Sequence, residues 1–201
     1  MSTQKRRYEL KERARRQAET RRRIVEATVS LHEEQGPAAT TIAEIARRAG
    51  VSRLTVYNHF PTDGELFAAC QERFLAETPP PDLSSALALA DPQERLREVL
   101  AALYRSYRRQ APMAGKVLRD RERLPALDAL LAQTVDASQA ELAETLASGF
   151  APGRRAARRT RAVVALALDF FTWQRLTREG LGDDGAATLM AELVAASAAA
   201  G

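Results

Sequence analysis

The sequence predicts an all-α protein in which an N-terminal three-helix unit, containing a helix-turn-helix, is joined to a C-terminal helical domain. Three observations support this fold class. Apolar residues recur at helical spacing in most segments, glycines and prolines separate those segments, and basic residues crowd the first third of the chain. We expect a basic N-terminal arm at residues 1–20, the helix-turn-helix domain with a connecting helix at 21–78, and the second helical domain at 79–201.

The stretch from residue 41 to residue 60 has the pattern of two short helices joined by a tight turn. Thr41 and Glu44 have the spacing of a capping box, which opens the first helix. Gly50 ends that helix, because glycine enters the left-handed conformation without a steric penalty, and Ser52 can cap the second helix. This is the pattern of a helix-turn-helix, whose second helix enters the major groove of DNA.

The charge of the chain is distributed unevenly. Residues 1–60 hold thirteen Lys and Arg against seven Glu, a net charge of +6, whereas the whole chain carries +4. The N-terminal part alone therefore favours a polyanionic partner. Residues 1–20 have almost no core-forming positions, so they either extend the first helix or form a flexible arm.

The pattern around the helix-turn-helix resembles the N-terminal domain of the TetR (tetracycline-repressor) family of bacterial regulators. The resemblance covers about residues 21–70 and rests on Ile24, Ala27, Gly36, Thr41, Ile45, Ala46, Ala49, Gly50, Val51, Ser52, Thr55, Tyr57, His59 and Phe60. It implies a homodimer that binds a palindromic operator in double-stranded DNA and that a small-molecule effector releases. Asp63 departs from the family's pattern, which has a lysine there and a phosphate contact with it.

The expected DNA contacts divide between bases and backbone. We expect the major groove to be faced by Arg53, Leu54, Thr55, Tyr57 and Asn58, and the backbone to be contacted by Arg22, Thr41, Ser52 and His59, the last on the strength of the resemblance. The amide of Asn58 suits adenine and the guanidinium of Arg53 suits guanine, although either group can instead hold a phosphate. Leu54 either touches a thymine methyl group or covers a neighbouring core residue.

The second domain is expected to consist of helices throughout. Asp91 and Pro92 are a strong start signal, with Asp as N-cap and Pro at the first helical position. Pro112 is expected to break the helix that begins there. The helices expected after this break cover residues 113–123, 125–149, 154–179 and 186–198.

The last two of these helices have more apolar surface than one partner helix can cover. This excess favours a four-helix bundle completed by a second subunit, although an intramolecular core would also explain it. The resemblance implies the dimer.

The resemblance also implies an effector pocket inside the helical body. The tentative ligand-binding residues are the few polar, aromatic or flexible side chains that the body offers, namely Tyr104, Tyr107, Met113, Asp169, Phe170 and Trp173. Taken one by one, the aromatic residues fit an ordinary core at least as well. Asp169 interrupts an apolar helix, so we expect it to be a buried carboxylate paired with an arginine such as Arg105 or Arg119.

Several classes of function are disfavoured. Residues 82–201 contain no His, no Cys and no phosphate-binding glycine loop, so we expect no enzyme, no cofactor and no metal site. The single Cys70 excludes an internal disulfide, and no long apolar span suggests a membrane partner, so we expect a cytoplasmic protein. The sequence thus predicts a ligand-responsive transcriptional regulator, more readily a repressor than an activator. The alternative is an effector-independent, nucleoid-type DNA-binding protein.

Overall fold

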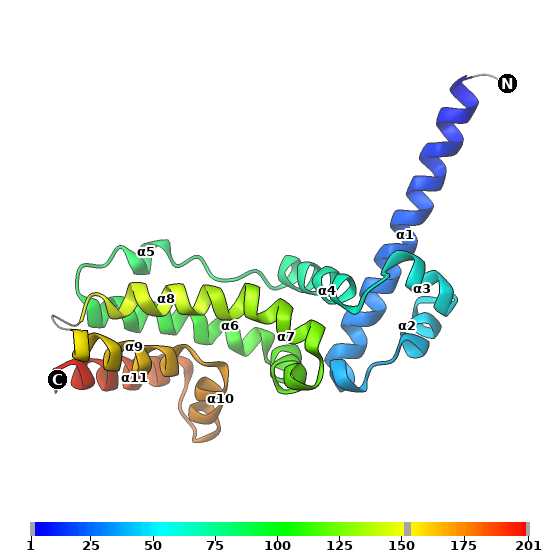
Figure 1. Cartoon of the computed structure of the whole chain (residues 1–201). Helices are drawn as coiled ribbons and strands as arrows, with labels where there is room; N and C mark the ends of the chain where they lie inside the picture. The colour runs from blue at the N-terminus through cyan, green and yellow to red at the C-terminus, as the bar shows by residue number, and fades with distance from the viewer. Residues whose placement is uncertain (1–2, 151–153, 200–201) are drawn as a thin grey trace. The chain divides into compact units, whose positions relative to one another are not determined.

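The computed structural model describes residues 3–150 and 154–199, and every regular element among them is helical (Figure 1). The all-α prediction is confirmed. The elements are α1 (Thr3–Gln35), η1 (Pro37–Ala39), α2 (Ile42–Ala49), α3 (Arg53–His59), α4 (Asp63–Glu77), α5 (Ser84–Leu87), α6 (Pro92–Asp120), η2 (Arg121–Arg123), α7 (Pro125–Leu131), the π-helical turn η3 (Ala132–Asp136), α8 (Ala137–Ala147), α9 (Arg154–Leu168), α10 (Phe170–Arg178) and α11 (Asp183–Ala199).

The chain divides into two compact units. The first unit comprises Met1–Glu77 together with Lys116–Leu130, and the second comprises Thr78–Gly115 together with Leu131–Gly201. Helix α6 therefore contributes to both, with its last turn in the first unit. None of the helices described is long and apolar enough to cross a membrane.

The first unit forms its helix-turn-helix as the sequence pattern predicts. The Thr41 hydroxyl accepts a hydrogen bond from the Glu44 N–H, and the Glu44 carboxylate accepts one from the Thr41 N–H, so the capping box is complete. Gly50 has φ +66°, the left-handed conformation that ends α2. The unit's core contains Ile24 of α1, Ile45 of α2 and Val56 of α3, all of which are buried.

Helix α1 begins before the helix-turn-helix core. Of the two alternatives for residues 1–20, the structure has the extended helix from Thr3 onwards. The first buried residue of the described part of α1 is Ile24, so the preceding turns contribute nothing to the core.

Two helix boundaries in the expectations were wrong. Helix α6 runs through Pro112 to Asp120 instead of breaking there. Pro112 is exposed, so water can donate to the carbonyl that the missing N–H leaves unpaired, while buried residues before and after it (Leu100, Tyr104 and Met113) hold α6 in the core.

The second error concerns Asp169. The expected single helix over residues 154–179 is divided into α9 and α10, and Asp169 is the N-cap of α10 in an extended conformation. Its carboxylate accepts the Thr172 N–H at 2.8 Å. Asp169 is half-buried, and the expected arginine partners are paired elsewhere, Arg105 with Asp184 and Arg119 with Asp120. The carboxylate interrupts the helical pattern because it starts a new helix.

Candidate nucleic-acid interface

The recognition helix α3 separates a buried side from an exposed side. Val56 is fully buried and the following Phe60 is 3% exposed, so these two residues anchor the helix. The opposite side presents Arg53, Leu54, Tyr57 and Asn58, whose i, i+1, i+4, i+5 spacing places them on one face. All four are exposed, and Leu54 (68%) and Tyr57 (50%) are among the most exposed large apolar side chains described. The face therefore offers a guanidinium, an amide and a phenol beside the apolar side chain of Leu54.

The other expected contacts of the helix-turn-helix have structural roles. The Ser52 hydroxyl accepts the Thr55 N–H at 3.0 Å and lies 2.8 Å from the Thr55 hydroxyl. Thr41 is committed to its capping box, where its hydroxyl also donates to Glu44 at 2.8 Å. These residues fix the ends of α2 and α3, and so fix the direction in which α3 presents its exposed face.

A cleft between α1 and α3 gathers a second group of expected residues. Its volume is about 430 Å³, and its lining consists of Gln17, Ala18 and Arg21 from α1 with Thr55, Asn58 and His59 from α3. The guanidinium of Arg21 lies over the Phe60 ring, 4.9 Å from its centroid, which holds this cation beside α3.

From the sequence, Arg21, Arg22 and Arg23 all suit phosphate contacts, and Arg22 is the one named among the expected contacts; in the structure Arg21 is the one that lines the cleft beside α3. Arg22 is exposed and binds Glu19 at 2.7 Å and Glu26 at 2.9 Å. The hydrogen bond from Arg22 lowers the pKa of the Glu19 carboxyl. The signal that favours Arg21 is its spacing from Gln17 and Ala18 on one face of α1, and the sequence alone does not show that α3 lies beside this face.

The turn between α1 and α2 is held by the last turn of α6, within the same unit. The Asp120 carboxylate, on a residue that is 2% exposed, accepts the Ala38 N–H at 3.1 Å and the Arg119 Nε–H at 2.7 Å. These bonds lower the pKa of Asp120, the one from Arg119 most strongly. Gly36 has φ +93°, and a Cβ there would lie 2.6 Å from Asp120 Oδ2, so this turn requires glycine.

His32 lies at the end of α1 in the same region. It is 3% exposed, its ring is 5.9 Å from that of Phe67, and burial lowers its pKa to about 4 despite the opposing charge of Asp120. His32 is therefore a neutral core residue at physiological pH.

In the second unit, the structure brings most of the tentative ligand residues together. The Tyr107 ring lies 5.6 Å from Phe170 and 5.9 Å from Trp173, and the Tyr104 ring is 6.1 Å from Tyr107. Met113 is likewise buried in this unit. We call Tyr104, Tyr107, Phe170 and Trp173 the aromatic cluster.

The polar atoms of the aromatic cluster have internal partners. The Tyr104 hydroxyl donates to the Ala167 carbonyl and the Tyr107 hydroxyl to the Leu168 carbonyl, both at 2.7 Å. Because α9 ends at Leu168, these two carbonyls belong to the helix end that lacks intrahelical partners. Burial raises the pKa of the Tyr107 hydroxyl to about 12. The tyrosines thus stabilise the break that Asp169 makes between α9 and α10.

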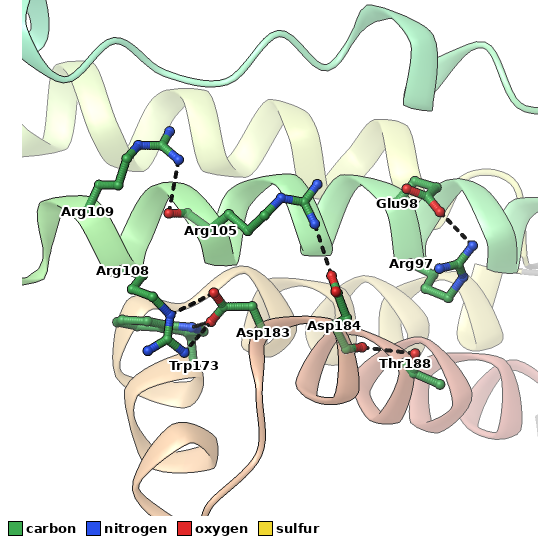
Figure 2. Close-up of polar contacts among 9 residues, drawn as sticks. All are labelled: Arg97, Glu98, Arg105, Arg108, Arg109, Trp173, Asp183, Asp184 and Thr188. Carbon is green, nitrogen blue, oxygen red and sulfur yellow. Dashed lines mark hydrogen bonds and ion pairs between the residues drawn. The ribbon is translucent and has the colours of Figure 1, made fainter.

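Trp173 is fixed in a similar way (Figure 2). Its indole Nε1–H donates to Asp183 at 2.9 Å, and the same carboxylate accepts two hydrogen bonds from Arg108, at 2.7 and 2.8 Å. The Arg108 guanidinium lies 5.8 Å from the indole centroid. These bonds, the one from Arg108 first, lower the pKa of Asp183. The arrangement attaches the start of α11 to α6.

A cavity of about 380 Å³ lies beside this cluster, within the second unit. Of the six tentative ligand residues, only Tyr107 lines it. The other lining residues come from the α4–α6 connection, α6, α8 and α9, namely Pro80, Pro81, Leu83, Leu87, Leu103, Ser138, Gln139, Glu141, Leu142, Thr145 and Leu168. Sequence reasoning missed these residues because no motif marks a cavity that four separate segments enclose.

Comparisons with known proteins identify the first unit. The model of the bacterial regulatory proteins of the tetR family matches residues 24–70. The HTH-type transcriptional regulator AcrR of Shigella flexneri is 36% identical over 85 residues, which are 41% of this chain and 39% of that protein. Residues 24–70 are therefore a DNA-binding domain of the TetR family. BetI of Rhizobium meliloti, another HTH-type transcriptional regulator, is 29% identical over 86 residues, or 43% of this chain and 42% of that protein.

The match to these relatives is partial, because the chain spans about two fifths of their length. Solved structures resemble the chain over more of its length. A TetR-like regulator from Rhodococcus sp. RHA1 covers 90% of this chain and 96% of its own, with a TM-score of 0.60 and 21% identity. A TetR regulator from Haloarcula marismortui covers 91% and 98%, with a TM-score of 0.56 and 19% identity. These likenesses show that the chain shares the fold of these TetR-like regulators.

Proposed function

We propose that this TetR-family protein is a cytoplasmic repressor that binds a palindromic operator as a homodimer. The observation that carries the proposal is the exposed face of α3, where Arg53, Leu54, Tyr57 and Asn58 project from a helix that Val56 and Phe60 anchor. A face with a guanidinium, an amide and apolar groups suits direct readout of base edges in the major groove. His59, which lines the cleft beside Arg21 together with Thr55, would contact the adjacent backbone.

The dimer is supported by apolar side chains that the second unit leaves exposed. Leu166 of α9, Phe171 of α10 and Leu193 of α11 are 55%, 44% and 49% exposed. Side chains of this size and exposure on helices of one unit suit a protein–protein interface. A two-fold dimer would place two α3 helices about 34–36 Å apart, one turn of DNA.

The operator part of the proposal is tested with Tyr57→Ala. The variant should bind DNA from upstream of its own gene at least tenfold more weakly, while its dimerisation and thermal stability stay those of the wild type. Binding is measured at fixed salt, with an unrelated duplex of equal length as competitor, since a nonspecific binder shows little preference between the two. Equal affinity for both duplexes in the wild type would favour the nucleoid-type alternative.

We further propose that the cavity of the second unit holds the effector that releases the DNA. Most of its lining is apolar, its polar groups are few, and Glu141 is its one charged side chain. A pocket without Lys or Arg suits an apolar molecule that is neutral or positively charged better than an anion.

The effector part is tested by filling the cavity. Leu142→Trp should retain promoter binding but lose its response to any compound that releases the wild-type protein, as found by a thermal-shift screen scored on promoter binding. Ala140→Trp, on an exposed residue of the same helix that does not line the cavity, is the matched control. A normal response in Leu142→Trp would place the effector elsewhere.

A further inference from the structure

The part of α1 that precedes the core is strongly basic. Residues 1–23 hold ten Lys and Arg against three Glu, a net charge of +7, whereas the whole chain carries +4. Between Arg7 and Arg23 no residue is buried. We call residues 3–23 the α1 extension. Its charge and the absence of buried positions indicate a surface for an external partner instead of a packing element.

The extension has the dimensions of a DNA-binding element. It forms one helix with the rest of α1, and 21 helical residues span roughly 30 Å at about 1.5 Å each. Figure 1 shows this part of α1, in the darkest blue, continuing beyond α2 and α3 of the same unit. Duplex DNA carries one negative charge per roughly 1.7 Å of axis, so an element of this length meets many phosphates.

One face of the extension continues the cleft beside the recognition helix. Ala18 and Arg21 line that cleft with Thr55 and Asn58 of α3. Residues 7, 11, 14, 18 and 21 have i, i+4, i+7, i+11, i+14 spacing, which keeps them on one side of a helix. This face therefore has cations at Arg7, Lys11 and Arg21 with only alanines at the intervening positions, and small side chains let a helix approach its partner closely.

Two of the three acidic residues of the extension pair with arginines that do not belong to this face. Glu12 pairs with Arg15 and Arg16, and Glu19 pairs with Arg22. Within the part of the chain that the structure describes, Arg7 and Lys11 have no ion pair and both are exposed. These two cations can bind phosphate without first losing a protein partner.

We propose that this face of the α1 extension binds the DNA backbone beside the base pairs that α3 reads, through Arg7 and Lys11. The partner is the phosphate backbone of the same DNA duplex, so the inference rests on the proposed operator binding. The contacts are independent of sequence, and they lengthen the DNA segment that each subunit occupies.

The experiment compares two double variants that remove the same charge. Arg7→Gln/Lys11→Gln changes the proposed face, and Arg13→Gln/Arg16→Gln changes nearly the opposite side of the helix. Affinity for the upstream DNA is measured between 50 and 200 mM salt. We expect Arg7→Gln/Lys11→Gln to reduce the slope of log K against log salt by about 2 per subunit, since each phosphate contact contributes about 0.9. The control variant should change the slope by less than half as much.

A second duplex, which ends at the outer edges of the two half-sites, locates the contact. On this short duplex Arg7→Gln/Lys11→Gln should bind like the wild type, because the flanking phosphates are absent. Equal slopes for the two double variants, or equal losses on both duplexes, would overturn the inference. Neither of these two results would contradict the proposed operator binding, which is tested separately with Tyr57→Ala.

Discussion

The exposed face of α3 and the aromatic cluster of the second unit differ in whether their polar groups already have partners. On α3, Tyr57 and Asn58 are exposed, and the helix is held by buried residues on its other side. In the cluster, the Tyr104, Tyr107 and Trp173 donors are all bonded to groups of the same unit. A ligand can use the first set without cost to the fold, whereas it would have to compete with the fold for the second. Substitutions on α3 should therefore change binding, and those in the cluster should change stability.

The largest effect is expected for Trp173→Ala. The ring is 4% exposed, and its removal deletes contacts with Tyr107 and Phe170, so the free energy of unfolding should fall by about 3–5 kcal/mol. Denaturant titration measures the loss. Trp173→Phe, which keeps a ring but loses the bond to Asp183, should lose less. A Trp173→Ala protein of wild-type stability that fails only to respond to effector would show that this residue is a ligand contact.

Asp120→Ala should have the next largest effect, although it lies in the DNA-binding unit. The substitution leaves the Ala38 N–H without its acceptor, and the free energy of unfolding should fall by about 2–3 kcal/mol. Asp120→Asn keeps an acceptor and should recover part of this loss. Equal stability of the Ala and Asn variants would mean that the bond to Ala38 contributes nothing.

His32 should make the stability depend on pH. Its pKa is lowered from 6.5 to about 4 in the folded protein, so the unfolded chain binds a proton first as the pH falls. The contribution of His32 to the free energy of unfolding is fully present above about pH 6.5 and is lost as the pH falls towards 4, by about 2 kcal/mol at pH 5. The difference in unfolding free energy between wild type and His32→Gln, measured at pH 7 and pH 5, should shrink by this amount. A constant difference would contradict a neutral buried His32.

Leu54→Ala should have the smallest effect on stability, within about 0.5 kcal/mol, because the side chain is 68% exposed. This exposure favours a thymine contact over the alternative that Leu54 covers a core residue. Replacing thymine by uracil at single operator positions removes one methyl group, and at the contacted position should cost the wild type about 0.8 kcal/mol. The variant should be indifferent to that replacement. A sensitivity to uracil that survives in Leu54→Ala would assign the methyl contact to another residue.

The features that depend on neighbouring residues were predictable from the sequence. The capping box at Thr41, the left-handed Gly50 and the cap at Ser52 each follow from groups within a few positions of one another, and all are confirmed. Asp169 shows the limit of this reasoning. A carboxylate in an apolar run has two local explanations, a buried charge and a helix start, and packing decides between them.

Features that depend on packing were not predictable. The cavity has lining residues between Pro80 and Leu168, and only Tyr107 among them was expected. Arg21, and not Arg22, lies beside α3 because α1 is rotated to bury Ile24 and Val25 against the rest of the unit. Rotating α1 by the angle of a single residue changes which arginine faces α3, and the apolar periodicity of a sequence defines the rotation of a helix only approximately.

The contribution of Lys116–Asp120 to the first unit has a consequence for chimeras between this chain and other proteins of the same fold. A chimera joined at Glu77 would carry its own Gly36 and Ala38 but take residue 120 from another protein. Unless that protein also has a carboxylate at position 120, the Ala38 N–H loses its acceptor. A side chain larger than Asp at that position would also crowd Gly36, which Asp120 already approaches closely. To transfer a DNA specificity between two such proteins, both the helix-turn-helix and the last turn of α6 therefore have to be exchanged.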